Sequence, residues 1–309
     1  MGDKVLVIGA TLLDTKGKPI EGLEPNTSNP AEIRVTRGGT ARNVAENLAR
    51  LGADVVLVST VGDDLIGRRL IEQTAASGVN TEHVRIIPGE YTGTYIAILE
   101  DDGSLSVALD DVQVIRHISP DYLYRHRTLF RDVDFVMMDG SLTTEAVGMV
   151  VSLCGDYDVP LVADPSSNRL AYKLRPYLPH IHLIVPNEAE AVELCQIGLI
   201  NDDPDLSLEL ARSLVQGGVE NVVVTLSDFG LAYATSQETG YVPPQYMEMV
   251  DSTGTGDAVT AAIIFGMLNA LPPVEAIRLG AAAAGLTLQT TETVVPDLSL
   301  DLLYEHLII

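Results

Sequence analysis

The feature that most constrains the fold of this 309-residue chain is a regular alternation of short apolar runs with helical stretches, which begins near Ser119. The apolar runs are typical of buried strands and fall at residues 133–138, 160–163, 182–185 and 222–226. Strands that alternate with helices favour an α/β fold, in which helices cover both faces of a mainly parallel sheet. Later strands are predicted at 230–235 and 246–250, and closing helices at 258–271, 273–288 and 300–307.

The first third of the chain is less regular. An apolar run at 4–9 predicts a buried first strand, whereas the polar, proline-containing segment 10–37 is typical of a partly exposed excursion. Helices are predicted at 40–51 and 65–76, a strand at 54–61, and a hairpin at 92–99 and 105–109. The excursion and the hairpin could pair as a small sheet that acts as a lid. The chain would then divide into a core strand (1–10), a lid segment (11–37), core (38–91), a lid hairpin (92–112) and further core (113–309).

Composition limits the partners of the chain. The formal charge of −24 repels phosphate backbones and anionic lipids, which argues against nucleic acid and membranes. No apolar run reaches membrane-spanning length, and the N-terminus lacks the basic region and cleavage site of a targeting signal. The two cysteines, Cys154 and Cys195, have no CxxC spacing, which fits buried thiols in a reducing cytoplasm. We therefore expect a soluble, cytoplasmic protein that acts on a small molecule.

The stretch DSTGTGDAVTAAIIFGML (251–268) contains the clearest chemical signal. Gly254 and Gly256 flank Thr255, and Asp257 follows just before an apolar helical run. Glycine backbone at such a place can aim successive N–H groups into one concavity, and the N-terminus of the helix adds the positive end of its dipole. Residues 254–256 are therefore a candidate anion hole.

A carboxylate beside an anion hole makes chemical sense if the anion is being transferred. The amides would take the charge that develops on a phosphoryl group, while Asp257 would take the proton of the acceptor hydroxyl. A metal ion would offset the repulsion between the two. Taken alone, the same string could also be an ordinary helix start without a ligand, so other motifs have to decide.

Two further motifs fit the same chemistry. Gly38 and Gly39 precede a predicted helix and allow a polyhydroxylated ligand to approach the backbone, and Asn43 offers a donor and an acceptor one turn later. Asn187 and Glu190 follow a predicted strand, share one helix face, and could hold Mg²⁺ through waters beside ATP phosphates. The alternatives are a plain helix cap at the first motif and a capping box at the second, and a capping box can coexist with a Mg²⁺ role.

Together these stretches resemble the PfkB carbohydrate kinase family, also called the ribokinase family. GGTARNVAENLARLGADVVLVSTVGDDLIG (38–67) looks like its N-terminal signature, DSTGTGD (251–257) like its C-terminal signature, and VPNEAE (185–190) like its N-x-x-E motif. The resemblance implies a ribokinase-like fold with a β-sheet lid, and phosphorylation of a sugar or nucleoside hydroxyl by MgATP. There is no GxxxxGK[ST] loop, and no GxGxxG fingerprint follows the first strand, which argues against a dinucleotide-dependent oxidoreductase.

The resemblance also implies roles for individual residues. Asp257 would be the catalytic base, and Gly254, Thr255 and Gly256 the anion hole. Substrate binding would fall to Asp14, Gly38, Gly39, Asn43 and Asp139. The nucleotide and its Mg²⁺ would be bound by Asn187, Glu190, Thr225, Ser227, Gly254 and Gly256, although Ser227 stands where the family usually has glycine. A monovalent cation such as K⁺ activates many members, and Asp251 would contribute to its site.

Three stretches suggest the acceptor. RNVAENLARLG (42–52), PGEYTGTYIAIL (88–99) and VALDDVQV (107–114) look most like the pseudouridine kinase branch, which implies a nucleoside 5′-hydroxyl as acceptor. Thr94 and Asp111 are candidate lid contacts, although strand propensity also explains Thr94. The alternatives are a free-sugar kinase of the ribokinase or fructokinase type and a non-catalytic nucleoside-binding regulator. The exposed lid sheet suggests a homodimer formed through it, as in many relatives.

Overall fold

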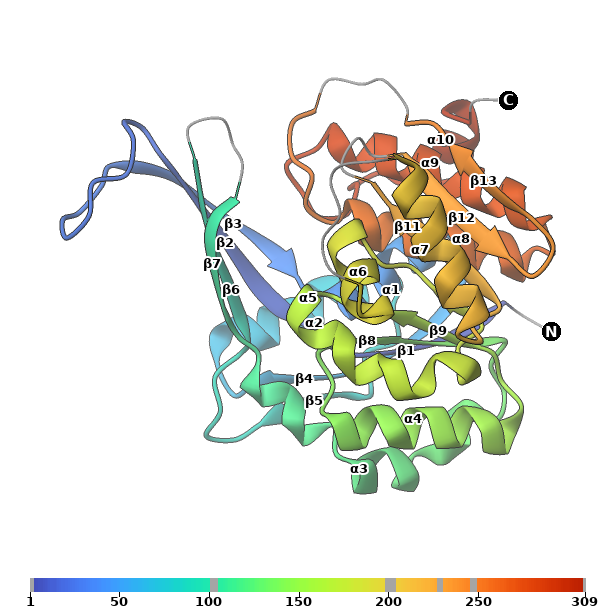
Figure 1. Ribbon diagram of the computed structural model, residues 1–309. Helices are drawn as coiled ribbons and strands as arrows, with labels where there is room; N and C mark the ends of the chain where they lie inside the picture. Colours follow the sequence, from blue (N-terminus) through green and yellow to red (C-terminus); the bar gives the residue numbers. More distant parts are fainter. Residues whose placement is uncertain (1–2, 101–104, 198–203, 227–229, 245–248, 308–309) are drawn as a thin grey trace.

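A computed structural model describes residues 3–100, 105–197, 204–226, 230–244 and 249–307 (Figure 1). Within these residues a nine-stranded sheet forms the body of the molecule. Its strands, in spatial order, are β13 (Thr239–Val242), β12 (Leu231–Thr235), β11 (Asn221–Thr225), β10 (Leu183–Ile184), β9 (Leu161–Asp164), β8 (Phe135–Asp139), β1 (Lys4–Ile8), β4 (Asp54–Gly62) and β5 (Val84–Ile87). The strands from β11 to β5 are parallel, while β12 and β13 close one edge as an antiparallel hairpin.

Helices cover both faces of this sheet, as the sequence predicts. Successive residues of β1 show the division, because Val5 and Val7 belong to one apolar cluster and Leu6 and Ile8 to the other. The first face is covered by α1 (Thr40–Leu51), α8 (Thr255–Leu268), α9 (Pro273–Leu288) and α10 (Leu300–Glu305). The second face is covered by η1 (Gln113–His117), α3 (Pro120–Arg125), η2 (Arg127–Phe130), α4 (Thr144–Tyr157), α5 (Asn168–Ala171), η3 (Tyr172–His180), α6 (Glu188–Cys195) and α7 (Pro204–Gln216). Helix α2 (Leu65–Ala76) packs against β4 and β5.

A second sheet, which we call the lid sheet, projects from the body on the left of Figure 1. Its strands, in spatial order, are β3 (Ala31–Gly38), β2 (Leu12–Pro19), β6 (Thr94–Leu99) and β7 (Leu105–Asp111). The excursion and the hairpin thus pair through a parallel contact between β2 and β6. The predicted class, a mainly parallel sheet with helices on both faces and a separate small sheet, is confirmed. The boundaries between core and lid segments remain an interpretation.

Two local predictions differ from the structure. The strand predicted at 246–250 falls partly on 245–248, outside the described residues, and Met249 and Val250 form no strand. The last strand among the described residues is β13, which a tight turn from Thr235 to Glu238 folds back onto β12. Helix α8 begins at Thr255 instead of residue 258, because Gly254 adopts a left-handed conformation (φ 84°) that ends the preceding loop. Asp257 therefore lies inside the first helical turn.

Candidate active site

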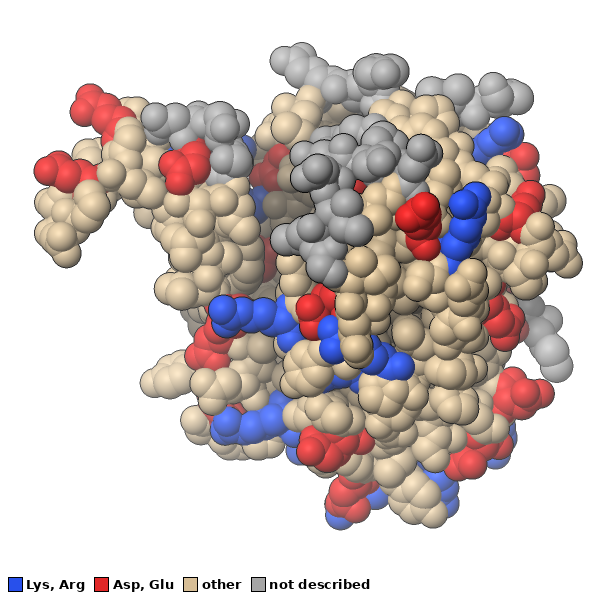
Figure 2. Space-filling view, in the orientation of Figure 1, with Lys and Arg blue, Asp and Glu red and all other residues tan. Residues whose placement is uncertain are grey.

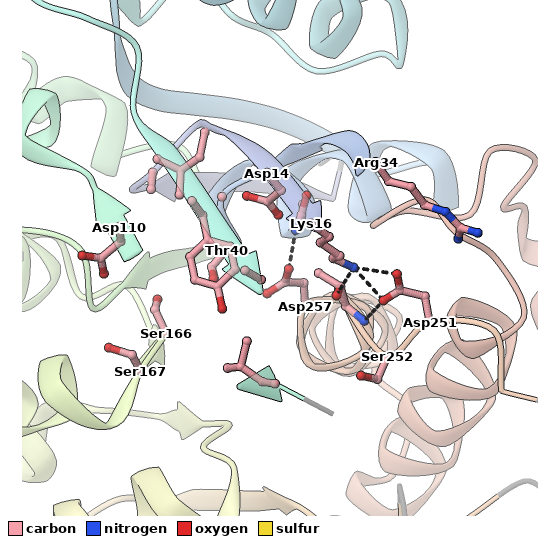
Figure 3. Close-up of a pocket in the computed structure, with 18 of the residues that line it drawn as sticks. Asp14, Lys16, Arg34, Thr40, Asp110, Ser166, Ser167, Asp251, Ser252 and Asp257 are labelled. Atoms are coloured by element: carbon pink, nitrogen blue, oxygen red, sulfur yellow. Dashed lines mark hydrogen bonds and ion pairs between the residues drawn. The ribbon is translucent and has the colours of Figure 1, made fainter. Parts of the chain in front are cut away.

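A cavity of about 960 Å³ lies between the lid sheet and the body. Lid strands contribute Asp14 and Lys16 to its lining, and the body contributes Asn43, Asp251 and Asp257. Figure 2 shows the hollow beside the projecting lid sheet, and Figure 3 shows these acidic and basic side chains gathered around it. The N-terminal and C-terminal motifs, far apart in the sequence, therefore meet at one site.

The start of α8 borders this cavity through Thr253 and Asp257, while the predicted anion-hole residues between them, Gly254, Thr255 and Gly256, do not line it. No side chain caps the helix, so its first-turn amides are not taken up by a capping group. A Cβ at Gly256 would meet nothing within 4 Å, which leaves open space next to the backbone, whereas one at Gly254 would lie 2.1 Å from the carbonyl oxygen of Thr293. Thr255 is buried and its hydroxyl donates to the carbonyl of Ser252 at 2.7 Å. The geometry suits an anion at the helix start.

Asp257 lies in this first turn and is held by Asn43. The Asn43 amide nitrogen donates to Asp257 Oδ2 at 2.5 Å. Burial raises the pKa of Asp257 to about 6, and the charges of Asp14 and Asp139 add to the rise, while Asn43 and the Arg42 charge oppose it. A carboxylate with a pKa near the working pH is suited to accept a proton.

Asn43 is itself oriented by a buried network. Arg42 is fully buried and donates to the side-chain oxygen of Asn43, to the carbonyl of Gly38 at 3.0 Å and to Glu46 Oε2 at 2.5 Å. The hydroxyl of Thr293 lies 3.2 Å from the Asn43 oxygen. Because that oxygen is engaged as an acceptor, the amide nitrogen faces Asp257 as a donor.

The two glycines before α1 make room for side chains of the site. A Cβ at Gly38 would lie 2.0 Å from Asp14 Oδ1, so only glycine lets that carboxylate occupy its place. Gly39 has φ 94°, and a Cβ there would lie 2.4 Å from the carbonyl oxygen of Ala10. Burial raises the pKa of Asp14 to about 6, and the charges of Arg42 and Lys16 limit the rise. Asp14 lines the cavity, as an acceptor-binding carboxylate would.

Asp139 borders the same cavity, but its oxygens are occupied by the chain itself. Oδ2 accepts from the backbone N–H groups of Ala10 (2.8 Å) and Ala41 (3.1 Å), and Oδ1 accepts from the N–H (3.0 Å) and the hydroxyl of Ser141. The carboxylate thus ties the end of β1 to the start of α1. This arrangement gives Asp139 a structural role in addition to the predicted substrate contact.

The nucleotide motif sits at the neighbouring strand ends. Asn187 and Glu190 form the capping box, in which the Asn187 side chain accepts from Glu190 N at 2.9 Å and Glu190 Oε2 accepts from Asn187 N at 2.9 Å. Thr225, at the end of β11, pairs with Asn187 across a parallel bridge. These three residues are brought together, but they do not line the cavity described above. Ser227 lies outside the described residues.

The carboxyl groups of Glu190, Asp164 and Asp257 influence one another through their charges. Burial raises the pKa of Glu190 to about 7, and the Asp257 charge adds to the rise. Burial also raises the pKa of Asp164, and the charges of Glu190 and Asp257 add to it. Among the described residues, no three His, Cys, Asp or Glu side chains gather closely enough to hold a metal ion by themselves. A Mg²⁺ ion at these carboxyl groups would need waters or phosphate oxygens to complete its coordination.

The predicted lid contacts do not line the cavity. Thr94 and Asp111 are paired across β6 and β7, and the neighbouring pair, Tyr95 and Asp110, lines the cavity instead. Adjacent residues on a strand point to opposite faces, so a shift of one position exchanges the two pairs.

Asp251, the predicted ligand of a monovalent cation, is paired with a lysine. Lys16 Nζ lies 2.7 Å from Asp251 Oδ1 and 2.6 Å from Oδ2 (Figure 3). Both oxygens therefore already face a positive charge that belongs to the chain. A K⁺ ion does not fit a carboxylate engaged in this way.

Sequence reasoning missed four residues of the site: Lys16, Arg42, Tyr95 and Asp164. For Arg42 and Asp164 a signal exists, since Arg42 belongs to the N-terminal signature and Asp164 ends a buried strand at the edge where ligands bind. For Lys16 no local signal points to a partner 235 positions away.

The fold and the site define a class of enzyme: a phosphotransferase that acts on a hydroxyl group. The chain belongs to the pfkB family of carbohydrate kinases, which it matches over residues 3–299.

Individual relatives agree with this class. The chain is 32% identical to a pseudouridine kinase of Escherichia coli strain K12, over 96% of this chain and 94% of the relative. It is 27% identical to a guanosine-inosine kinase of Exiguobacterium acetylicum, over 96% and 98% of the two chains. Its fold matches the structure of Arabidopsis thaliana ribokinase complexed with ribose and ATP, with a TM-score of 0.82, 22% identity and 100% of both chains covered. The predicted ribokinase-like fold is thereby confirmed.

Proposed function

We propose that this protein transfers the terminal phosphoryl group of MgATP to the 5′-hydroxyl of a nucleoside, with pseudouridine as the preferred acceptor. One observation carries the proposal: Asp257, in the first turn of α8, lines the same cavity as Asp14 and Asn43 and accepts a hydrogen bond from Asn43. A proton acceptor, an anion-binding helix start and a hydroxyl-binding carboxylate then surround one space. The family membership supports the reaction class.

In this mechanism the acceptor occupies the cavity against Asp14 and Asn43, beneath the lid sheet. Asp257 removes the proton from the acceptor hydroxyl, while Asn43 keeps the carboxylate turned toward the cavity. The amides of Gly256 and Asp257 stabilise the charge that develops on the transferred phosphoryl group. Closure of the lid sheet would exclude water, which strengthens these interactions.

The nucleotide would bind along the strand ends near Asn187 and Thr225. Mg²⁺, when bound, would neutralise phosphate charge and relieve the repulsion among Asp164, Glu190 and Asp257. The chain's own contribution is to hold those carboxyl groups in place, with Glu190 fixed through the capping box and Asp164 held by the backbone N–H of Ser166 at 2.9 Å.

The preference for pseudouridine rests on the pseudouridine kinase relative and on the inner face of the lid sheet. Tyr95 offers an aromatic ring, and Asp110 offers carboxylate oxygens that can accept hydrogen bonds. Pseudouridine is joined to its ribose through carbon, so its ring keeps one more N–H donor than uridine. An acceptor carboxylate at Asp110 would favour that donor.

Two further features belong to the proposal. Both cysteines are free, which fits a reducing cytoplasm as the site of action. The outer face of the lid sheet exposes Ile33, Val35, Ile96 and Leu109, with exposed fractions of 39–68%, which would suit a homodimer formed through the lids.

The test is a measurement of ADP release with ATP and Mg²⁺ across pseudouridine, uridine, cytidine, adenosine, guanosine, inosine, ribose and fructose. We expect the highest kcat/KM with pseudouridine and a lower value with uridine. A free sugar as the best substrate would replace the proposal by a ribokinase or fructokinase activity. Nucleoside binding by calorimetry without any ADP release would instead indicate a regulator.

A further inference from the structure

An ion pair joins the lid sheet to the loop that precedes the anion hole. Lys16 belongs to β2 of the lid sheet, and its ammonium group contacts both carboxylate oxygens of Asp251 at 2.6–2.7 Å. The same ammonium group also donates to the hydroxyl of Thr253. Figure 3 shows Lys16 turned away from Asp14 and toward this loop. One lid side chain thus holds two residues of the segment that leads directly into Gly254.

This ion pair differs from an ordinary surface salt bridge. The side chains of Lys16 and Asp251 are only 10% and 17% exposed, so solvent and salt screen their attraction little. Asp251 also accepts from the backbone N–H of Thr253 at 2.9 Å, which closes the loop on itself. Without a positive partner, a carboxylate at this depth would be strongly disfavoured in its charged form.

The position of the ion pair connects it to catalysis. Thr253 immediately precedes Gly254, whose left-handed backbone sets the start of α8 and the direction of the first-turn amides. The cavity already holds the carboxylates of Asp14 and Asp257. A negative charge at Asp251 without a partner would add to this acidic field beside the place where phosphate must bind.

We propose that Lys16 is a positioning residue whose ammonium group takes the place of a bound monovalent cation at Asp251. It neutralises the carboxylate and fixes the 251–254 loop, so that the anion hole is formed without K⁺. The inference rests on the proposed phosphoryl transfer, since it assigns a role to the loop that forms the anion hole.

The experiment compares the wild type with Lys16→Met in potassium, ammonium and tetramethylammonium chloride at equal ionic strength. The wild type should show the same kcat in all three salts. Lys16→Met should lose about tenfold or more in kcat in tetramethylammonium, because a buried carboxylate is left unpaired. It should regain part of that loss in potassium or ammonium, which can enter the vacated position.

A readout independent of activity comes from thermal unfolding. Potassium should raise the unfolding midpoint of Lys16→Met relative to tetramethylammonium, because a ligand that binds only the folded state stabilises it, while the wild type should not respond. Lys18→Met removes the same charge two residues further along β2 and should leave the cation response as in the wild type. Adding Asp251→Asn to Lys16→Met removes the carboxylate and should abolish the response again.

Several results would overturn the inference. A wild type that needs potassium for full activity would show that Lys16 does not supply the charge. A Lys16→Met variant that raises KM for ATP with no cation response would show that Lys16 binds phosphate instead. If no acceptor is phosphorylated by the wild type, the proposed function fails, but the unfolding measurements still decide whether Lys16 replaces a cation.

Discussion

Two aspartates beside the cavity, the buried Asp139 and the partly exposed Asp257, differ in how the chain uses their oxygens. Burial raises the pKa of both carboxyl groups. Asp139 accepts hydrogen bonds from three backbone N–H groups and one hydroxyl. Asp257 accepts one side-chain hydrogen bond, from Asn43, and faces the cavity.

We infer that this difference separates a structural carboxylate, Asp139, from a reactive one, Asp257. A carboxylate whose lone pairs are filled by backbone donors holds the fold together but has little capacity left for a substrate proton. A carboxylate that is held by one donor and otherwise faces a cavity is oriented and still able to accept. The residue type and the direction of the pKa shift are the same at both positions, so the contacts and the partial exposure of Asp257 distinguish them.

Removing the charge of Asp257 tests its role as a base directly. Asp257→Asn should lower kcat by about 10²–10⁴-fold, because a general base typically contributes that much. Its thermal midpoint should equal or exceed that of the wild type, since a neutral amide avoids the cost of a buried charge. Steady-state kinetics and calorimetric unfolding check the two halves, and a variant that keeps more than a tenth of the wild-type rate would rule out Asp257 as the base.

The matched change, Asp139→Asn, should reduce stability more than it reduces activity. Asp139→Asn places a donor NH₂ group against backbone N–H donors, so at least one of them loses its acceptor. We expect the free energy of unfolding to fall by about 1–3 kcal/mol, the cost of an unsatisfied buried group. Denaturant unfolding at neutral pH measures this, and an unchanged midpoint would show that the hydrogen bonds to Asp139 contribute no net stability. The fall in kcat should be smaller than for Asp257→Asn.

The pH dependence of the rate tests the ionisation of Asp257. Asp257 must be ionised to accept a proton, and its pKa is about 6, so kcat/KM should fall about tenfold per pH unit below that value. Because the folded pKa lies above the unfolded value of 3.8, ionisation costs stability, and this cost disappears as the pH falls from about 6 to below 3.8. Asp14→Asn removes a neighbouring negative charge and should move the kinetic midpoint to lower pH. A profile that stays flat down to pH 5 contradicts the assignment.

A smaller change in substrate affinity is expected on the inner face of the lid sheet. Tyr95 lines the cavity, whereas Thr94 next to it does not. Tyr95→Phe should raise KM for the nucleoside several-fold by removing one hydrogen-bonding hydroxyl, worth about 1 kcal/mol. Thr94→Val should leave KM unchanged. Equal effects from the two variants would show that the inner face of the lid sheet does not contact the acceptor.

Patterns within one segment predict much of this molecule. The alternation of apolar runs and helices predicts the parallel sheet, and the GTGD string predicts a helix start with donors and an acid. Contacts between distant segments are less visible in the sequence. Nothing near Lys16 indicates Asp251, and the four donors to Asp139 come from Ala10, Ala41 and Ser141, which only the folded sheet brings together.

The choice between Thr94 and Tyr95 shows a second limit. Both fit a strand, and the face that each presents depends on the register with β7, which pairs Tyr95 with Asp110. Similarly, the start of α8 depends on the backbone of Gly254, so a helix predicted from residue 258 leaves Asp257 before the helix instead of inside its first turn. Small errors in register or boundary therefore matter most at the site itself.

Asp14 and Lys16 stand two residues apart on β2, and both line the cavity. They cannot move independently, because one short stretch of extended backbone carries them both. Any outward swing of β2 that withdraws Asp14 from an acceptor must also pull Lys16 from Asp251. Opening of the lid sheet and release of the 251–254 loop would then be a single event, and under the proposed function the phosphate site would be complete only while the lid is closed over an acceptor.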